Sequence, residues 1–166
     1  MNALLINNLI DNGFSPTSKL WIYTSDKSFD KTDELQIQND LDNFCSHWDS
    51  HGILLNAKGF ILLSRIIVLV VDDANNSISG CSMDKSVAFL KNLENKYKIS
   101  LFNRLLQTGF FDGQWQTFST DIWADKLKAN EISLNSLFID TLVSNLQDFQ
   151  NNGVKKLGEF WLKRLI

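Results

Sequence analysis

Apolar side chains recur at helical spacing in two stretches of the chain. In the first stretch, five residues fall at i, i+4, i+7, i+8 and i+11, which is one face of an α-helix. These are Ile37, Leu41, Phe44, Cys45 and Trp48. The pattern predicts a helix over residues 32–50, capped at its start by Asp30 or Thr32. In the second stretch, a helix is predicted to begin near Ser82 or Asp84. Its apolar face consists of Val87, Leu90, Leu93 and Tyr97.

Aromatic and β-branched segments around these helices have the composition of strands. The predicted strands of this half are residues 20–24, 53–57, 60–71 and 77–81. A turn is expected at Lys58–Gly59, and residues 77–81 are expected to return antiparallel to the strand before them. The continuous apolar run 66–71 is typical of a central strand buried on both faces.

The second half is predicted to begin with a hairpin. Asp112–Gly113 lies between residues 101–111 and 114–118, and Asp-Gly is a strong two-residue hairpin turn. The remaining predicted elements are a short helix from Ser119 or Thr120 to Lys128, a strand over residues 136–143 and a helix over residues 154–165. Hairpin connections dominate this order. The expected fold is therefore α+β, with a mixed or mainly antiparallel sheet flanked by helices.

The composition is that of one globular domain. The chain has 166 residues, 44% of them hydrophobic, with one proline and eight glycines, and no composition break forces a division. We expect a single domain over residues 1–166, with a weak seam near residues 98–101.

Charge and hydropathy indicate which kinds of partner and which cellular compartment the sequence favours. The net charge is −3 and the basic residues are scattered, which makes nucleic acid a poor first guess. The apolar run of residues 3–10 lacks the preceding positive charge and the cleavage site of a signal peptide. The longest uninterrupted apolar run, residues 66–71, is too short to span a membrane. These features favour a cytoplasmic protein, and we expect no cofactor.

Six segments resemble a family of uncharacterised Bacteroidetes proteins of about this length. They are residues 20–23 (LWIY), 48–52 (WDSHG), 65–72 (RIIVLVVD), 79–87 (SGCSMDKSV), 101–104 (LFNR) and 160–164 (FWLKR). The end of the chain departs from the family pattern, which places a tryptophan and a histidine together there. Members often carry the label ABC transporter ATPase. The phosphate-binding string Gly-x-x-x-x-Gly-Lys-Ser/Thr is missing from this sequence, so the resemblance implies a fold and a lineage without an activity.

Cys81 is the sharpest candidate for chemistry. It lies at a predicted strand-to-helix junction, where the positive end of the helix dipole favours the thiolate. His51 is a candidate base for it, and Arg65 and Lys85 are candidate anion partners. Ser82 and Asp84 complete the candidate ligand-binding residues, since Ser82 and Lys85 have the Ser-x-x-Lys spacing of serine acyl enzymes. The plainer interpretation is that Cys81 packs as a small hydrophobe and that Ser82 or Asp84 caps a helix.

His47 and His51 are four residues apart, a spacing that suits a metal ion when both lie on one helix face. His51 falls at the predicted helix end, where histidine is favourable without a metal. No catalytic set is complete in this sequence. The preferred function is therefore a non-enzymatic binding or assembly module, with an unknown protein or small molecule as partner and a homo-oligomer as a further possibility. The alternatives are a cysteine-dependent enzyme or thiol sensor using Cys81, and a module that binds a small ligand or a metal.

Overall fold

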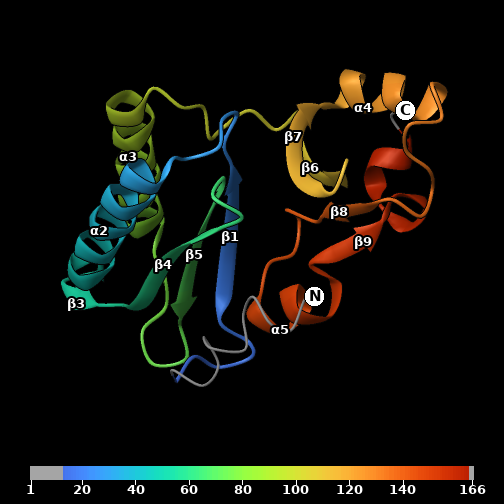
Figure 1. Cartoon of the computed structure of the whole chain (residues 1–166). Coiled ribbons are helices and arrows are strands. Elements are labelled where there is room, and N and C mark those ends of the chain that lie inside the picture. The colour runs from blue at the N-terminus through green and yellow to red at the C-terminus, as the bar shows by residue number, and fades with distance from the viewer. Residues whose placement is uncertain (1–12, 165–166) are drawn as a thin grey trace.

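Three layers make up the protein in this computed structural model, which describes residues 13–164 (Figure 1). Helices α2 (Lys31–His47) and α3 (Gly80–Tyr97) cover one face of a three-stranded sheet. A four-stranded sheet and helix α5 (Leu146–Asn152) lie on the opposite side. The three-stranded sheet is therefore the middle layer.

The middle sheet has the strand order β1-β5-β4, and both pairs are antiparallel. Its strands are β1 (Lys19–Thr24), β4 (Asn56–Leu62) and β5 (Ile66–Asp72). Successive strand side chains point to opposite faces. In β5, Ile67, Leu69 and Val71 contact the helix layer. Ile66, Val68 and Val70 contact the second sheet and α5, so the prediction of a central strand buried on both faces is confirmed.

The second sheet has the order β7-β6-β8-β9, again with antiparallel pairs only. Its strands are β6 (Leu106–Phe111), β7 (Gln114–Ser119), β8 (Leu137–Ile139) and β9 (Val154–Lys156). The predicted hairpin is confirmed, with positive φ angles of 49° at Asp112 and 76° at Gly113. Helix α4 (Thr120–Lys128) follows β7, as predicted. Two 3₁₀ turns, η1 (Leu157–Glu159) and η2 (Trp161–Arg164), follow β9.

The α+β class is confirmed, and within residues 13–164 the strand pairs are antiparallel. They are divided between two main sheets and a small ribbon of β2 (Asp49–Ser50) and β3 (Ile53–Leu54). Helix α2 is capped by Asp30, whose side chain accepts from the amides of Thr32 and Asp33. It ends three residues before the predicted boundary, because Trp48 has extended backbone angles that lead into β2.

Three predicted elements were wrong, the first two of them in the N-terminal half. The chain does not turn at Lys58–Gly59, which lies inside β4. It turns at residues 63–65 instead, so the predicted strand 60–71 is divided between β4 and β5. A Cβ on Gly59 would lie 2.9 Å from the Leu41 Cδ2 atom, so this glycine lets α2 approach the sheet. Residues 77–81 form no strand. Helix α3 begins at Gly80 instead, because the side chains of Ser79 and Ser82 form a reciprocal capping box.

The third error is the C-terminal helix. Residues 154–156 pair with β8, and the chain then continues in 3₁₀ turns. Helix α5 was not predicted. Its start is capped by the Asn145 side chain, which accepts from the Asp148 amide at 2.8 Å.

Two sequence-based expectations concern the whole chain. The apolar run 3–10 lies outside the described residues. Within residues 13–164, every helix is too short or too polar to cross a bilayer. The expected seam falls where Lys98, with a left-handed φ of 54°, ends α3. One core nevertheless combines Leu20 and Val68 from before this point with Leu146 and Phe149 from after it.

Candidate functional site

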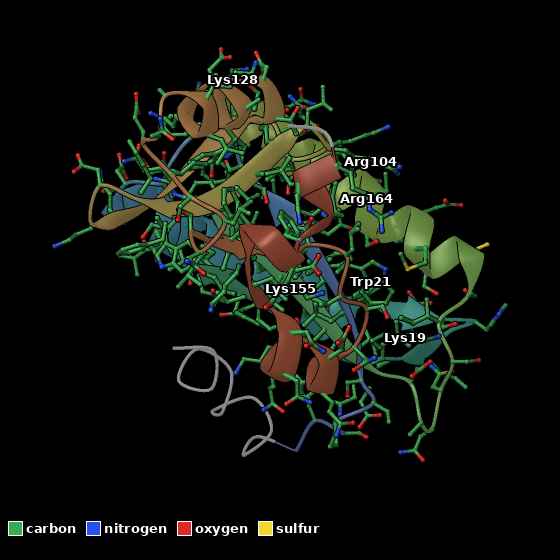
Figure 2. The ribbon with its side chains drawn as sticks, turned by 90° about the vertical axis from the view of Figure 1, so that its right-hand side faces the viewer. Lys19, Trp21, Arg104, Lys128, Lys155 and Arg164 are labelled. Atoms are coloured by element: carbon green, nitrogen blue, oxygen red, sulfur yellow. The ribbon has the colours of Figure 1, made fainter. Side chains whose placement is uncertain are left out.

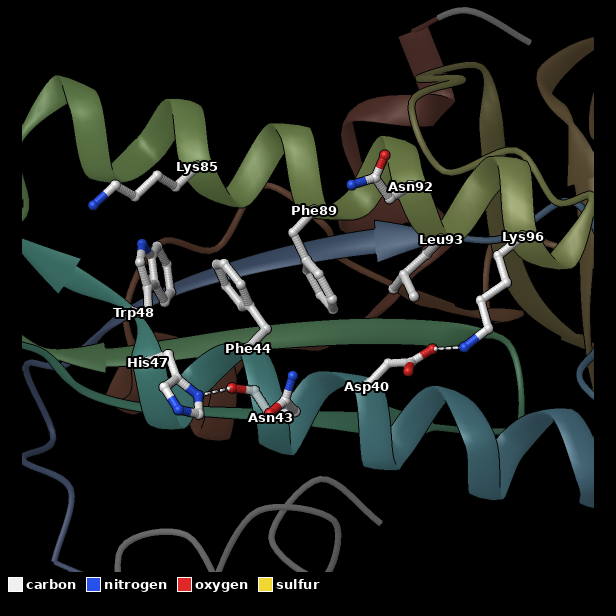
Figure 3. A pocket seen from close by; sticks show the side chains of 10 residues that line it. All are labelled: Asp40, Asn43, Phe44, His47, Trp48, Lys85, Phe89, Asn92, Leu93 and Lys96. Carbon is white, nitrogen blue, oxygen red and sulfur yellow. Dashed lines mark hydrogen bonds and ion pairs between the residues drawn. The ribbon is translucent and has the colours of Figure 1, made fainter.

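A groove runs between α2 and α3 on the outer face of the helix layer (Figure 3). The helices are antiparallel, since Asp40 of α2 pairs with Lys96 near the end of α3, and Trp48 bonds to Ser82 near its start. The groove has a volume of about 640 Å³. From Lys85 to Lys96 it is about 16 Å long, at 1.5 Å per helical residue.

Aromatic rings form the floor of this groove. Phe44 of α2 and Phe89 of α3 stack with their centroids 4.2 Å apart and their planes at 5°. Trp48 lies 5.0 Å from Phe44, measured between ring centroids. Phe44 and Phe89 are half-buried, whereas Trp48 is buried. Two phenyl rings therefore offer apolar area to a ligand at the surface.

Trp48 fixes one end of the groove. Its indole Nε1 donates to the Ser82 carbonyl oxygen at 2.8 Å, which joins the end of α2 to the first turn of α3. A buried indole that has its hydrogen bond is stable in place. The floor is therefore preformed at this end.

An ion pair lies at each end of the groove. Lys85 pairs with Asp49, and this ammonium lowers the pKa of the Asp49 carboxyl. Lys96 pairs with Asp40 at 2.7 Å, and the bond to Asp40 raises the pKa of Lys96. Asp40 also accepts from the Tyr97 hydroxyl at 2.7 Å. Because each cation has a carboxylate partner, the rim carries little net charge.

Two side-chain amides and an imidazole complete the rim. Asn43 and Asn92 are exposed on opposite helices, and within residues 13–164 their amide groups form no hydrogen bond. Figure 3 shows the exposed His47 ring next to Asn43. Its Nδ1 donates to the Asn43 backbone carbonyl at 2.9 Å. The free amides can each donate and accept, which suits a peptide backbone.

Four of the candidate residues from the sequence lie on the first turns of α3. Lys85 lines the groove. Cys81 is exposed one helical turn before it, on the same side of the helix. Ser82 is buried in the capping box, which supports the plainer interpretation of this residue. Asp84 is exposed.

His51 is near this end of the molecule, but Arg65 is not. His51 is exposed in the turn between β2 and β3, with a φ of 53°. This ribbon adjoins the segment before α3, where the Ser50 hydroxyl donates to the Ser77 carbonyl oxygen at 2.9 Å. Arg65 lies at the other end of β5, which is about 20 Å away at 3.3 Å per strand residue. The structure therefore does not bring Cys81, His51 and Arg65 into one cleft.

Arg65 has unusual surroundings of its own. Its Nε atom is buried and, within the described part of the chain, has no hydrogen-bond partner. Burial lowers the pKa of this guanidinium. Arg65 lines neither the α2–α3 groove nor the cavity between Asp140 and Arg164, so its position identifies no ligand site.

The two histidines do not share a helix face. His47 is the last residue of α2, and His51 follows in the β2–β3 turn. Over the described range, no three His, Cys, Asp or Glu side chains cluster as metal ligands would.

Positive charge on the face in Figure 2 is partly neutralised, since within residues 13–164 the exposed Arg104 and Arg164 form no ion pair. Three of the cations labelled there pair with carboxylates: Lys19 with Asp73 at 2.8 Å, Lys155 with Asp140 at 2.7 Å and Lys128 with Asp125 at 3.4 Å.

Comparison of the chain with protein-family models, curated proteins and solved structures finds no match. The resemblance to the Bacteroidetes family stays a hypothesis.

Sequence reasoning missed the groove as a site. It placed Phe44 on the buried face of its helix and gave no role to Phe89. The pattern that could have found the groove is a second stripe on α3 beside the buried one, at spacings of three and four. It consists of Lys85, Phe89, Asn92 and Lys96.

Proposed function

We propose that this protein is a non-enzymatic cytoplasmic binding module and that the α2–α3 groove binds a peptide segment of a partner protein. The segment contributes a flat or branched apolar side chain, which packs on the rings of Phe44 and Phe89. Its backbone bonds to the amides of Asn43 and Asn92. The observation that carries the proposal is the stacked phenyl pair, half-exposed in an open groove.

The charge of the groove supports an uncharged peptide as the occupant. Lys85 and Lys96 are already paired with Asp49 and Asp40. A strongly charged ligand would have to compete with these carboxylates or ammonium groups. An apolar side chain flanked by neutral amides needs no such exchange, and exposed aromatic area is typical of interaction sites.

A displayed library of random 12-residue peptides tests the proposal. It is panned against the wild-type chain after depletion on the Phe89→Ala variant. We expect the enriched peptides to share an aromatic or large aliphatic residue. Binding of a synthetic representative is then measured with a fluorophore on Cys81, which is exposed at the end of the groove, whereas Cys45 is buried.

Two variants decide the outcome of the titration. Phe89→Ala is expected to weaken binding by about tenfold or more, as loss of a central anchor does. Leu35→Ala is the matched control, because Leu35 is a large exposed apolar residue of α2 outside the groove. A library without enrichment, or a peptide that binds wild type and Phe89→Ala equally, would refute the groove as the binding site.

A further inference from the structure

The two main sheets have four outer strands, β1, β4, β7 and β9. An outer strand presents unpaired backbone N–H and C=O groups that can pair with another chain. Proteins protect such edges with charged side chains, short strands or covering segments. These four edges differ in that protection.

Three of the edges carry protection. In β4, Lys58 places a charge in the strand, and the Gln38 side chain donates to the Gly59 carbonyl oxygen at 2.9 Å. Strand β9 has only three residues, and two of them are Lys155 and Lys156.

The start of β1 is covered by the chain before α5. The Leu20 amide donates to the Ser144 carbonyl oxygen at 3.0 Å, and the Leu146 amide donates to the Ser18 carbonyl oxygen at 2.9 Å. Lys19 adds a charge at the same end. Pairing with another chain along β1 is therefore blocked at its start.

Strand β7 has none of these devices. Its six residues pair with β6 in unbroken register, so no bulge bends it. The chain has no charge and no proline between Asp112 and Asp121. No residue of β7 is buried. Within residues 13–164, no further strand lies beyond it.

The register shows which backbone groups face outward. The Thr120 amide donates to the Leu105 carbonyl oxygen at 3.0 Å. Hydrogen-bonded pairs alternate along an antiparallel ladder, so the groups of Gln114, Gln116 and Phe118 face β6. Those of Trp115 and Thr117 face away, and within the described range they make no backbone hydrogen bond outside the sheet.

We propose that β7 pairs with β7 of a second copy of this chain, antiparallel about a twofold axis at Gln116, so that Trp115 of each copy lies opposite Thr117 of the other. The outward groups of Trp115 and Thr117 in each copy donate to and accept from those of the other. Pairing a segment with itself brings like residues together, and in this neutral segment no like charges meet. The pairing joins the two four-stranded sheets into one.

An aromatic pair beside this edge supports a protein partner there, because a partner would bury apolar area that is now in contact with solvent. Phe110 and Trp115 meet edge to face with centroids 5.5 Å apart, and Phe110 is 38% exposed. A second copy brings its own pair to the same interface and buries apolar area from both sides. This proposal does not depend on the α2–α3 groove, which lies in the helix layer.

Light scattering during size-exclusion chromatography provides the first test. The wild-type chain is expected at twice its monomer mass of 19.0 kDa. Gln116→Lys places like charges together across the axis and is expected to give a monomer with unchanged circular dichroism. Gln147→Lys makes the same change at an exposed position of α5 and should leave the dimer intact. A monomeric wild type, or an intact Gln116→Lys dimer, would overturn the proposal.

Disulfide trapping provides the second test and identifies the edge directly. In a Cys81→Ser background, Gln116→Cys and Thr117→Cys are oxidised mildly, and at least one should form a cross-linked dimer. Gln114→Cys is the control. Its copies would lie about 13 Å or more apart, four strand residues at 3.3 Å, beyond disulfide reach. A dimer that Gln114→Cys cross-links as readily, or that neither central variant traps, would contradict β7 pairing.

Discussion

At the scale of single residues, the two cysteines have opposite surroundings. Cys45 is packed beneath α2 against the middle sheet, and burial raises the pKa of its thiol to about 12. Cys81 is exposed on the first turn of α3. Only Cys81 is accessible to a reagent, and it lies at the end of the α2–α3 groove.

Alkylation with iodoacetamide at pH 8 is expected to modify Cys81 alone in the folded protein. A thiol with a pKa near 12 is ionised to only about one part in 10⁴ at pH 8, and Cys45 is also shielded from the reagent. Mass spectrometry of peptides, with and without urea, measures both sites. Labelling of Cys45 in the native protein would contradict its burial.

The rate at which iodoacetamide alkylates Cys81 distinguishes a binding module from a cysteine-dependent enzyme or thiol sensor. We expect it to match that of free glutathione under the same conditions. A rate more than about tenfold higher would favour a reactive thiolate and with it the cysteine-dependent enzyme or sensor.

At the scale of elements, two glycines test how turns and helix starts are specified. Gly113 has a φ of 76°, and an added Cβ would meet no atom within 4 Å. Gly80 is the first residue of α3 and is equally unobstructed, but its φ is not in the left-handed region. The two positions differ in backbone conformation and not in available space.

Gly113→Ala is therefore expected to lower the free energy of unfolding by about 1–2 kcal/mol, the price of a left-handed backbone for a residue with a Cβ. Gly80→Ala is expected to leave it unchanged or raise it by up to about 1 kcal/mol. Urea denaturation measures both. Equal losses in the two variants would mean that the turn conformation is not the cause.

Local sequence patterns predicted those elements whose structure is specified by residues close to one another in the chain. The apolar stripe of α2, the run in β5 and the Asp112–Gly113 turn each specify one structure within a few neighbours. The prediction of a turn at Gly59 was wrong because the role of this glycine depends on Leu41, a residue of another element. The prediction of a helix over residues 154–165 was wrong because apolar residues at helical spacing also suit a strand followed by 3₁₀ turns. The groove was missed because Phe44 and Phe89 meet only after α2 and α3 have packed.

At the scale of the whole molecule, the core between the two sheets joins the halves of the chain. Leu146 of α5 is fully buried there among Leu20, Val68 and Val70 of the middle sheet. The prediction of a single domain thus depends on side chains contributed from both sides of residues 98–101.

Leu146→Ala is expected to lower the free energy of unfolding by about 2–5 kcal/mol, as a buried leucine deletion does. Because the core is shared, both halves should still unfold in one transition. Tryptophan fluorescence and far-ultraviolet circular dichroism should therefore give coincident urea curves. Leu142→Ala, at a residue 69% exposed, should change stability by no more than about 0.5 kcal/mol. Separate transitions in the wild type would place a domain boundary at the seam.

Strand β5 separates two buried clusters and contributes a different set of side chains to each of them. Ile67, Leu69 and Val71 fill the space beneath the helices, and Ile66, Val68 and Val70 fill the space beneath the second sheet. The buried clusters on the two faces have no residue in common, so we expect a change of size at one of these positions to be accommodated mainly on its own face. The helix layer can therefore acquire a new groove, by drift or by design, while the layer behind it keeps the molecule folded.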